Sequence, residues 1–322
     1  MSSDKKNKEI NIIEDVLEKP SSRRSFLKGI SIAAAAGSAS LVTGCLPSSD
    51  GASSEELKLR WQEFFQENYR LMTQEEKDET VSRLERLAKL QDNRDVQIGS
   101  EPPIEGVLYG YAFNITRCEG FMECVTACVK ENNLDRKTNT QYVRIFEMEP
   151  GQLDPGSGDG QFYHKVPVDN KFYMGAQCFH CENAPCIKAC PTKATWREPD
   201  GIVVVDYNWC IGCRYCQAAC PYFGRRFNWG QAEVPEDEIT KKQHYLGNRK
   251  RPKGKMEKCT FCIQRTRKGK LPACAEACPT GARVFGNLLD PDSEIRYVLK
   301  HKKVFRMKEN IGTEPKFWYF ID

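Results

Sequence analysis

The sequence predicts an α+β fold, with short helices and strands around clustered cysteines and a helical extension before them. Three observations lead to this prediction. Sixteen of the 322 residues are cysteine, and most of them stand in closely spaced sets. Apolar residues between positions 55 and 92 recur at helical spacing. Short apolar segments bounded by Gly, Pro and Asp indicate strands between and after the cysteine sets.

Composition and charge narrow the classes of function. Charged residues make up 29% of the chain and the mean hydropathy is −0.60, which together predict a soluble body. The formal net charge of +4 is too small to indicate nucleic acid as a partner. Beyond the N-terminal segment, no apolar run approaches membrane-spanning length.

Residues 1–44 are predicted to be an export signal and not part of the fold. Ser22–Lys28, SRRSFLK, is a twin-arginine motif, and the uncharged run that follows is too short for a membrane span. Residues 41–45, LVTGC, resemble a lipobox, so Cys45 is expected to be lipidated and to begin the mature protein. The alternative is cleavage nearby without lipidation. We therefore expect export by the twin-arginine route to a periplasmic or extracytoplasmic site, with a lipid anchor in the membrane.

A flexible tether and a helical extension are expected next. Residues 45–54 are rich in Ser and small residues. Residues 55–92 then show two helical patterns, and the segment Thr73–Glu76 fits a capping box that would begin the second helix. The helix pair could pack on its own domain or dock to a partner subunit, and the sequence leaves both open.

The stretch from 178 to 220 holds eight cysteines in two sets. They are Cys178, Cys181, Cys186 and Cys190, then Cys210, Cys213, Cys216 and Cys220. The second set reads C-x2-C-x2-C-x3-C-P, a spacing that gives three thiolates to one iron–sulfur cluster and the fourth to a neighbouring cluster. Three cysteines would lie on a tight loop, the fourth would begin a helix that points away, and the following proline would limit that helix.

Zinc and disulfides are the alternatives for these cysteines. Zinc needs only two C-x2-C pairs and would leave cysteines unused. Disulfides suit an exported protein, but such dense spacing is poor geometry for bridges. Ile211, Gly212 and Ala218 are expected to pack around a cluster. His180 could tune a cluster, although a packed, hydrogen-bonded histidine is the simpler interpretation.

The first set departs from this pattern. Cys118, Cys124 and Cys128 keep the spacing, but Phe121 stands where the second cysteine belongs. Phenylalanine cannot ligate iron, so this site has at most three cysteines. It could hold a three-iron cluster, a cube with a non-cysteine fourth ligand, or no cluster, and the carboxylates of Glu119 and Glu123 are nearby in sequence.

Two further segments are expected to be irregular or ribbon-like. Residues 142–146, YVRIF, and 162–168, FYHKVPV, are predicted strands of one ribbon, joined by the Gly- and Asp-rich turn between them. Residues 231–256 are polar and basic, with basic residues clustered between 249 and 255, and predict a solvated loop, with docking to an acidic partner such as a cytochrome as the alternative.

The last set is Cys259, Cys262, Cys274 and Cys278, interrupted by a basic loop over 264–273. Gly281 allows a tight return into a strand over 283–288, RVFGNL. The tail, ending FWYFID, is predicted to be a closing strand with aromatic cover.

These four sets resemble the four-cluster ferredoxin-like subunits of the complex iron–sulfur molybdoenzyme family. The third set, CIGCRYCQAACP, and the fourth, KCTFC with ACAEACPTGA, carry the resemblance over about residues 104–320. Members are the electron-transfer subunits of dimethyl sulfoxide, polysulfide and tetrathionate reductases, with relatives in formate-dependent nitrite reduction. The resemblance implies two ferredoxin-like α+β modules, the inner one at about 170–235 inserted into the outer one at about 104–168 and 240–322.

In that family the first set pairs with the fourth, and the second with the third. Applied to the cysteines of this sequence, that pairing implies three 4Fe-4S clusters and one 3Fe-4S cluster, the last possibly absent. The altered cluster would be held by Cys118, Cys124 and Cys278, and its neighbour by Cys128, Cys259, Cys262 and Cys274. The other two would be held by Cys178, Cys181, Cys186 and Cys220, and by Cys190, Cys210, Cys213 and Cys216. Cys45 is the one cysteine left over, which agrees with its expected lipidation.

The function implied is electron relay, without a catalytic residue. The partners implied are a catalytic subunit, with molybdopterin or multihaem cytochrome, and an integral membrane subunit that interacts with quinone. A scaffold or assembly subunit of such a complex is one alternative, and a stand-alone soluble carrier is another. Clusters at physiologically useful potentials would distinguish relay from scaffold.

Overall fold

The computed structural model describes residues 72–322. The export signal, Cys45 with its lipobox, the tether and the first expected helix lie outside these residues. The chain divides into two compact units. The described residues of one are 72–77 and 191–193, and those of the other are 78–190 and 194–322. The sheets and cysteine sites described below belong to the second unit.

Helix α4, Gln74–Asp92, begins at the predicted capping box. The backbone N–H of Thr73 donates to Glu76 Oε2 at 2.9 Å, and the backbone N–H of Glu76 donates to Thr73 Oγ1 at 3.3 Å. Two N–H groups that the helix leaves without an internal partner are thus satisfied. Among residues 72–322, no helix combines the length and the apolar character needed to cross a membrane.

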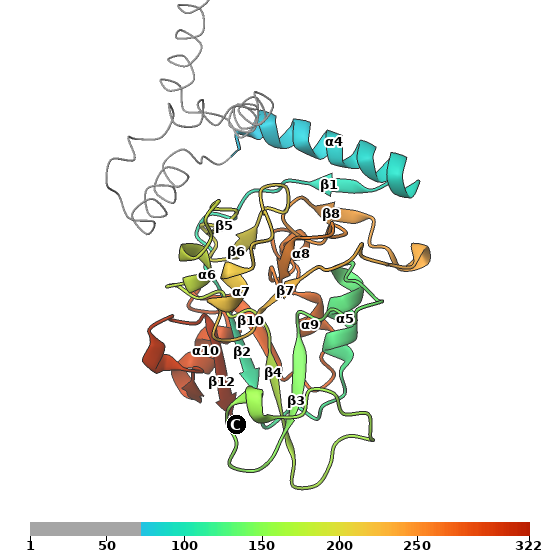
Figure 1. Cartoon of the computed structure of the whole chain (residues 1–322). Coiled ribbons are helices and arrows are strands. Elements are labelled where there is room, and N and C mark those ends of the chain that lie inside the picture. The colour runs from blue at the N-terminus through green and yellow to red at the C-terminus, as the bar shows by residue number, and fades with distance from the viewer. Residues whose placement is uncertain (1–71) are drawn as a thin grey trace, which may run out of the picture. The chain divides into compact units, whose positions relative to one another are not determined.

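A four-stranded sheet runs through the second unit in the order β10-β2-β12-β11 (Figure 1). Its strands are β10 (Arg283–Asn287), β2 (Tyr109–Asn114), β12 (Phe317–Ile321) and β11 (Lys303–Phe305). Strand β2 pairs antiparallel with β10 and parallel with β12. The strand predicted after Gly281 and the closing strand in the tail are therefore confirmed, and the tail completes this sheet.

Both faces of the sheet are covered by apolar side chains. On one face, helix α10 (Glu294–His301) buries Ile295 and Val298 against Ala112, Val284 and Phe320. Aromatic rings pack together from the same strands and their neighbours, and the Tyr111 ring stacks on Phe317 with 5.3 Å between centroids. Such burial and ring stacking are the main stabilising terms for a small layered domain.

Two-stranded ribbons and short helices complete the unit. The ribbons are β1 (Gln97–Gly99) with β8 (Lys242–His244), β3 (Arg144–Met148) with β4 (Phe172–Ala176), β5 (Thr195–Arg197) with β6 (Val203–Val205), and β7 (Arg225–Phe227) with β9 (Met256–Lys258). The short helices are α5 (Glu123–Glu131), α6 (Pro185–Lys188), α7 (Tyr215–Ala218), α8 (Ile263–Thr266) and α9 (Ala273–Glu276), with 3-10 turns η1 (Pro155–Ser157), η2 (Glu236–Glu238) and η3 (Glu309–Ile311). Helix α5 contacts α9, and α6 contacts α7.

The predicted ribbon has a different second strand. Strand β3 pairs with β4, with Ile145 opposite Gly175, and residues 162–168 form no strand. Pro167 lies in that segment and cannot donate a ladder hydrogen bond, whereas the sequence FYMGA of β4 has no such interruption. The prediction of a strand at FYHKVPV was wrong.

The basic segment between 249 and 255 is not a uniformly solvated loop. Arg249 and Arg251 are buried. Arg251 lies 4.0 Å from the centroid of the Tyr207 ring and donates to the carbonyls of Gly247 and Arg249. A flat guanidinium can stack on a ring while its edge donates to carbonyls, so these arginines stabilise the fold.

The segment between the cysteine pairs of the last set also differs from the expected loop. Its first part is helix α8, and the Arg267 side chain after it is buried against Asp200 and Glu198. The carboxylates of Asp200 and Glu198 make the burial of Arg267 possible, because a buried charge requires a partner.

Candidate metal centres

The cysteine at the third position of each set lies at the second residue of a short helix. These cysteines are Cys124 in α5, Cys186 in α6, Cys216 in α7 and Cys274 in α9. The residues before α5 and α7, Met122 and Arg214, have left-handed φ values of 67° and 65°, which turn the loop sharply into the helix.

The expectation that the fourth cysteine begins a helix was wrong. Cys190, Cys220 and Cys278 follow the ends of their helices, and Cys128 lies inside α5. The first-turn N–H groups, which have no partner within the helix, therefore lie beside the third cysteine and not the fourth.

Two cysteines of the altered first set and one of the last set line one cavity. Cys118, Cys124 and Cys278 lie around it together with Phe121, Glu119 and Glu123. The Phe121 side chain is 41% exposed. Burial raises the pKa of Cys118 to about 12. The hydrogen bond from the Gly120 N–H opposes this increase. Cys124 and Cys278 contribute further to the increase.

Four cysteines line a second cavity. Cys178, Cys181, Cys186 and Cys220 lie around it, with Arg225 and His180 also in the wall. Burial raises the pKa of Cys181, and the other three cysteines raise it further. His180 is fully buried, accepts the Val203 N–H at Nδ1 over 2.9 Å and stacks on Phe261, so its interpretation as a packed histidine is confirmed.

Cys128, Cys259, Cys262 and Cys274 form a third group, and all four are buried. Burial raises the pKa of Cys128, and Cys262, Cys274 and Cys259 raise it further. The side-chain amide of Asn132 lies 3.6 Å from Cys128 Sγ and 3.7 Å from Cys262 Sγ. This amide donor between two sulfurs has no sequence signature by which it could have been found.

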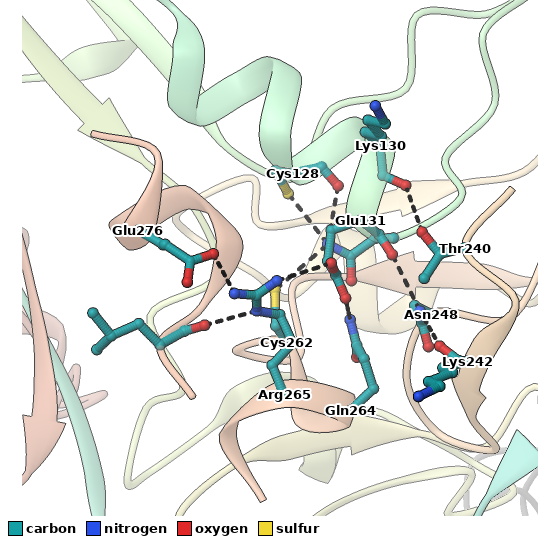
Figure 2. Close-up of polar contacts among 12 residues, drawn as sticks. Cys128, Lys130, Glu131, Thr240, Lys242, Asn248, Cys262, Gln264, Arg265 and Glu276 are labelled. Atoms are coloured by element: carbon teal, nitrogen blue, oxygen red, sulfur yellow. Dashed lines mark hydrogen bonds and ion pairs between the residues drawn. The ribbon is translucent and has the colours of Figure 1, made fainter. Parts of the chain in front are cut away.

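Polar contacts fix the helices that carry this third group (Figure 2). At the end of α5, Glu131 accepts from Gln264 at 2.9 Å and pairs with Arg265 at 3.2 Å. Arg265 also pairs with Glu276 of α9. Helices α5, α8 and α9 are thereby joined around Cys128 and Cys262.

Cys190, Cys210, Cys213 and Cys216 form the fourth group. Burial raises the pKa of Cys216 to about 11, the nearby Arg225 lowers it, and Cys190 and Cys210 raise it. Cys213 is half-buried on the same loop. Ile211 is 64% exposed and Ala218 is also exposed, and their packing around a cluster stays a prediction.

Successive groups lie next to one another. Burial is the largest cause of the raised pKa of Cys124, Cys259 and Cys216, and in each case a cysteine of another group adds to it. Cys274 acts on Cys124, Cys178 acts on Cys259, and Cys186 acts on Cys216. The contacts of α5 with α9 and of α6 with α7, together with the stacking of His180 on Phe261, agree with groups that are adjacent to one another.

The donor set fits iron–sulfur clusters. All fifteen cysteines of the described part are free thiols. Within residues 72–322, no three His, Cys, Asp or Glu side chains are grouped as ligands of a single ion would be. A cluster takes one thiolate at each iron, so its cysteines surround a space, as the cavity-lining cysteines do here.

The fold and these sites define a ferredoxin-like iron–sulfur protein, and comparisons with known proteins agree. Residues 170–241 and 244–288 match the family described as a 4Fe-4S dicluster domain. The chain is 39% identical over 212 residues to the putative dimethyl sulfoxide reductase iron–sulfur subunit of Halobacterium salinarum, covering 66% of this chain and 78% of the relative. It is 36% identical over 217 residues to Protein NrfC of Escherichia coli K12, covering 67% and 81%.

A third relative is a chain of the polysulfide reductase of Wolinella succinogenes. The identity is 34% over 211 residues, which cover 65% of this chain and 92% of the relative. The chain therefore belongs to the family of iron–sulfur electron-transfer subunits of molybdoenzyme and quinol oxidoreductase complexes.

Proposed function

We propose that this chain relays electrons through three 4Fe-4S clusters and one 3Fe-4S cluster. The ligands would be the four groups of cysteines described above, with Cys118, Cys124 and Cys278 holding the three-iron cluster. One observation carries the proposal: two cavities are lined by three and four cysteines, and the His180 ring beside one of them stacks on Phe261, which stands between Cys259 and Cys262. Helix α5 contacts α9 and α6 contacts α7, which supports the pairing of sets and two nested modules.

When bound, iron–sulfur clusters supply one-electron oxidation and reduction, with potentials set by charge, hydrogen bonds to sulfur and exposure. The chain's own residues control these conditions. Asn132 places an amide donor beside two sulfurs, His180 and Phe261 form a buried stack near another group, and most of the described cysteines are buried. Electron relay requires no acid, base or nucleophile.

We place this protein between a membrane partner that reacts with quinone or cytochrome and a catalytic subunit, such as a molybdopterin enzyme or multihaem cytochrome. The names of the relatives, which include reductase and menaquinol oxidoreductase subunits, support this position. The twin-arginine motif and the lipobox at Cys45 support an extracytoplasmic location with a lipid anchor.

A redox titration followed by EPR tests the relay. Protein purified anaerobically should show clusters that are reduced and reoxidised reversibly at potentials between those of quinone and the terminal acceptor. A scaffold subunit would show clusters that stay in one state across this range, or none. For the anchor, Cys45→Ala should move the exported protein from the membrane fraction to the soluble fraction; unchanged membrane association would contradict lipidation.

A further inference from the structure

Two buried arginines occupy equivalent positions in the sequence. Arg225 stands five residues after Cys220, and Arg283 stands five residues after Cys278. Each is the first residue of a strand, β7 and β10 respectively, and both side chains are buried, at 1% and 6% exposure. Each arginine therefore has the same spacing from the Cys-Pro dipeptide that ends a cysteine set.

Each arginine lines the same cavity as the cysteine that stands five residues before it. Arg283 lies in the wall with Cys118, Cys124 and Cys278. Arg225 lies in the wall of the cavity formed by the group that includes Cys220. The same offset from Cys190 and from Cys128 leads to uncharged residues, Thr195 and Asn133. Each arginine thus lines one cysteine cavity, and Arg225 also lies near Cys216 of the fourth group.

Neither guanidinium is neutralised by a carboxylate in the described part of the chain. Arg283 Nη1 donates to Gln177 Oε1 at 3.0 Å, and Arg225 Nη2 donates to Thr195 Oγ1 at 2.8 Å. Within residues 72–322, Nε of both arginines has no hydrogen-bond partner, nor do Arg283 Nη2 and Arg225 Nη1. A buried cation without a counter-charge is costly, so a nearby anion is expected.

The cysteines are the anions that these cations face. Burial lowers the pKa of Arg283, but Cys124, Tyr111 and Cys274 together outweigh this effect and the net pKa is raised. Burial also lowers the pKa of Arg225, nearby cysteines raise it, and the net pKa is raised. Cys186 makes the largest contribution to the increase. Thiolates bound to iron would present negative charge in the same places.

We propose that Arg225 and Arg283 are fixed counter-cations that raise the reduction potentials of the two clusters whose cavities they line. This inference rests on the proposed function and its ligand assignment. Reduction adds an electron to an anionic centre, and a buried cation stabilises the more negative state because the local dielectric is low.

The test compares neutral and charged replacements by EPR-monitored redox titration of the anaerobically purified, cluster-loaded protein. Arg283→Met should lower the midpoint potential of the three-iron cluster by at least about 59 mV. For one electron this shift corresponds to a tenfold change in the equilibrium constant. The effect of Arg283→Met on the 4Fe-4S midpoints should be smaller. Arg225→Met should lower most the 4Fe-4S midpoint of the cluster whose cavity it lines and leave the three-iron signal unchanged.

Charge and packing are separated by two controls. Arg283→Lys and Arg225→Lys keep the cation and should keep each midpoint near that of the wild type. Arg251→Met removes an arginine that is equally buried but lies against Tyr207, and should shift no midpoint. If a methionine variant loses iron from its own group only and the lysine variant keeps it, charge pairing is again supported.

Three results would overturn the inference. They are unchanged midpoints in methionine variants that retain their iron, equal shifts in the lysine and methionine variants, and loss of iron from the lysine variants as well. Failure of the proposed function is distinguishable, since it would appear in the wild type as an absence of redox-active clusters before any variant is compared.

Discussion

Arg267 and Asp200 form an ion pair in which both side chains are almost fully buried, with 3.0 Å between Arg267 Nε and Asp200 Oδ2. Arg267 also pairs with Glu198 at 2.9 Å and donates to the Glu101 carbonyl at 2.7 Å. One side chain therefore joins the end of α8 to the turn before β6 and to the segment before β2.

Loss of this arginine should be strongly destabilising. Arg267→Leu leaves Asp200 and Glu198 as buried charges without their partner, so we expect the free energy of unfolding to fall by about 3–5 kcal/mol. Anaerobic urea denaturation measures this change. Lys89→Ala breaks the exposed pair between Lys89 and Asp95 and should cost less than about 1 kcal/mol. Equal losses in the two variants would contradict the account.

Stability should fall on mild acidification because of His244. Burial lowers its pKa from 6.5 to about 4, and the Arg267 cation adds to this effect. Its Nδ1 accepts the Leu246 N–H at 3.1 Å, so its other nitrogen donates to the Glu101 carbonyl. Protonation would remove the Leu246 bond and place a second cation near Arg267.

The sign follows from the lowered pKa. The imidazole takes up a proton near pH 6.5 in the unfolded protein and only near pH 4 in the folded protein, so stability present at pH 7 is lost as the pH falls through this window. The full loss is about 3 kcal/mol. Urea denaturation at pH 7 and pH 5 should show a smaller loss for His244→Gln than for the wild type. The same loss in both proteins would show that His244 is not the group responsible.

The cysteine sets and two strands of the main sheet were predictable because their signals are local. The spacing of Cys210, Cys213 and Cys216 defines a loop, and Gly281 followed by an apolar run defines β10. The partner of β3 had only a weak local signal, because Pro167 disfavours a strand at residues 162–168 while the pairing with 172–176 also depends on which segment the rest of the fold brings alongside.

The buried arginines were missed for a similar reason. A run of basic residues predicts exposure unless the acceptors are known. Arg251 finds carbonyls in its own loop and the Tyr207 ring, and Arg267 finds carboxylates from a turn far away in sequence. Amino-acid composition contains no information on these contacts. The equal spacing of Arg225 and Arg283 from a Cys-Pro dipeptide, however, was present in the sequence.

The start of α4 should depend on the Thr73 hydroxyl. Thr73→Ala removes the acceptor for the Glu76 N–H and should destabilise the first turn by about 1 kcal/mol. Hydrogen exchange of the Glu76 amide should accelerate about fivefold. Thr73→Ser keeps a hydroxyl and should exchange like the wild type. Unchanged exchange in the alanine variant would contradict the capping role.

Gly212 should be required by the loop between Cys210 and Cys213. Its φ is +78°, and a Cβ there would meet the Gly254 carbonyl oxygen. Gly212→Ala should therefore lower the free energy of unfolding by at least about 1–2 kcal/mol, and the protein should lose iron. Gly230→Ala is the control, since a Cβ at that position meets no atom within 4 Å. Full iron retention and unchanged stability in Gly212→Ala would contradict this expectation.

Iron and sulfide content, measured together with low-temperature EPR on anaerobically purified protein, tests the central claim most directly. Four groups of cysteines, one with Phe121 in place of a ligand, predict about fifteen irons per chain and a three-iron signal in the oxidised protein. About twelve irons without that signal would contradict the three-iron cluster at Cys118, Cys124 and Cys278. Zinc in place of iron would contradict electron relay altogether.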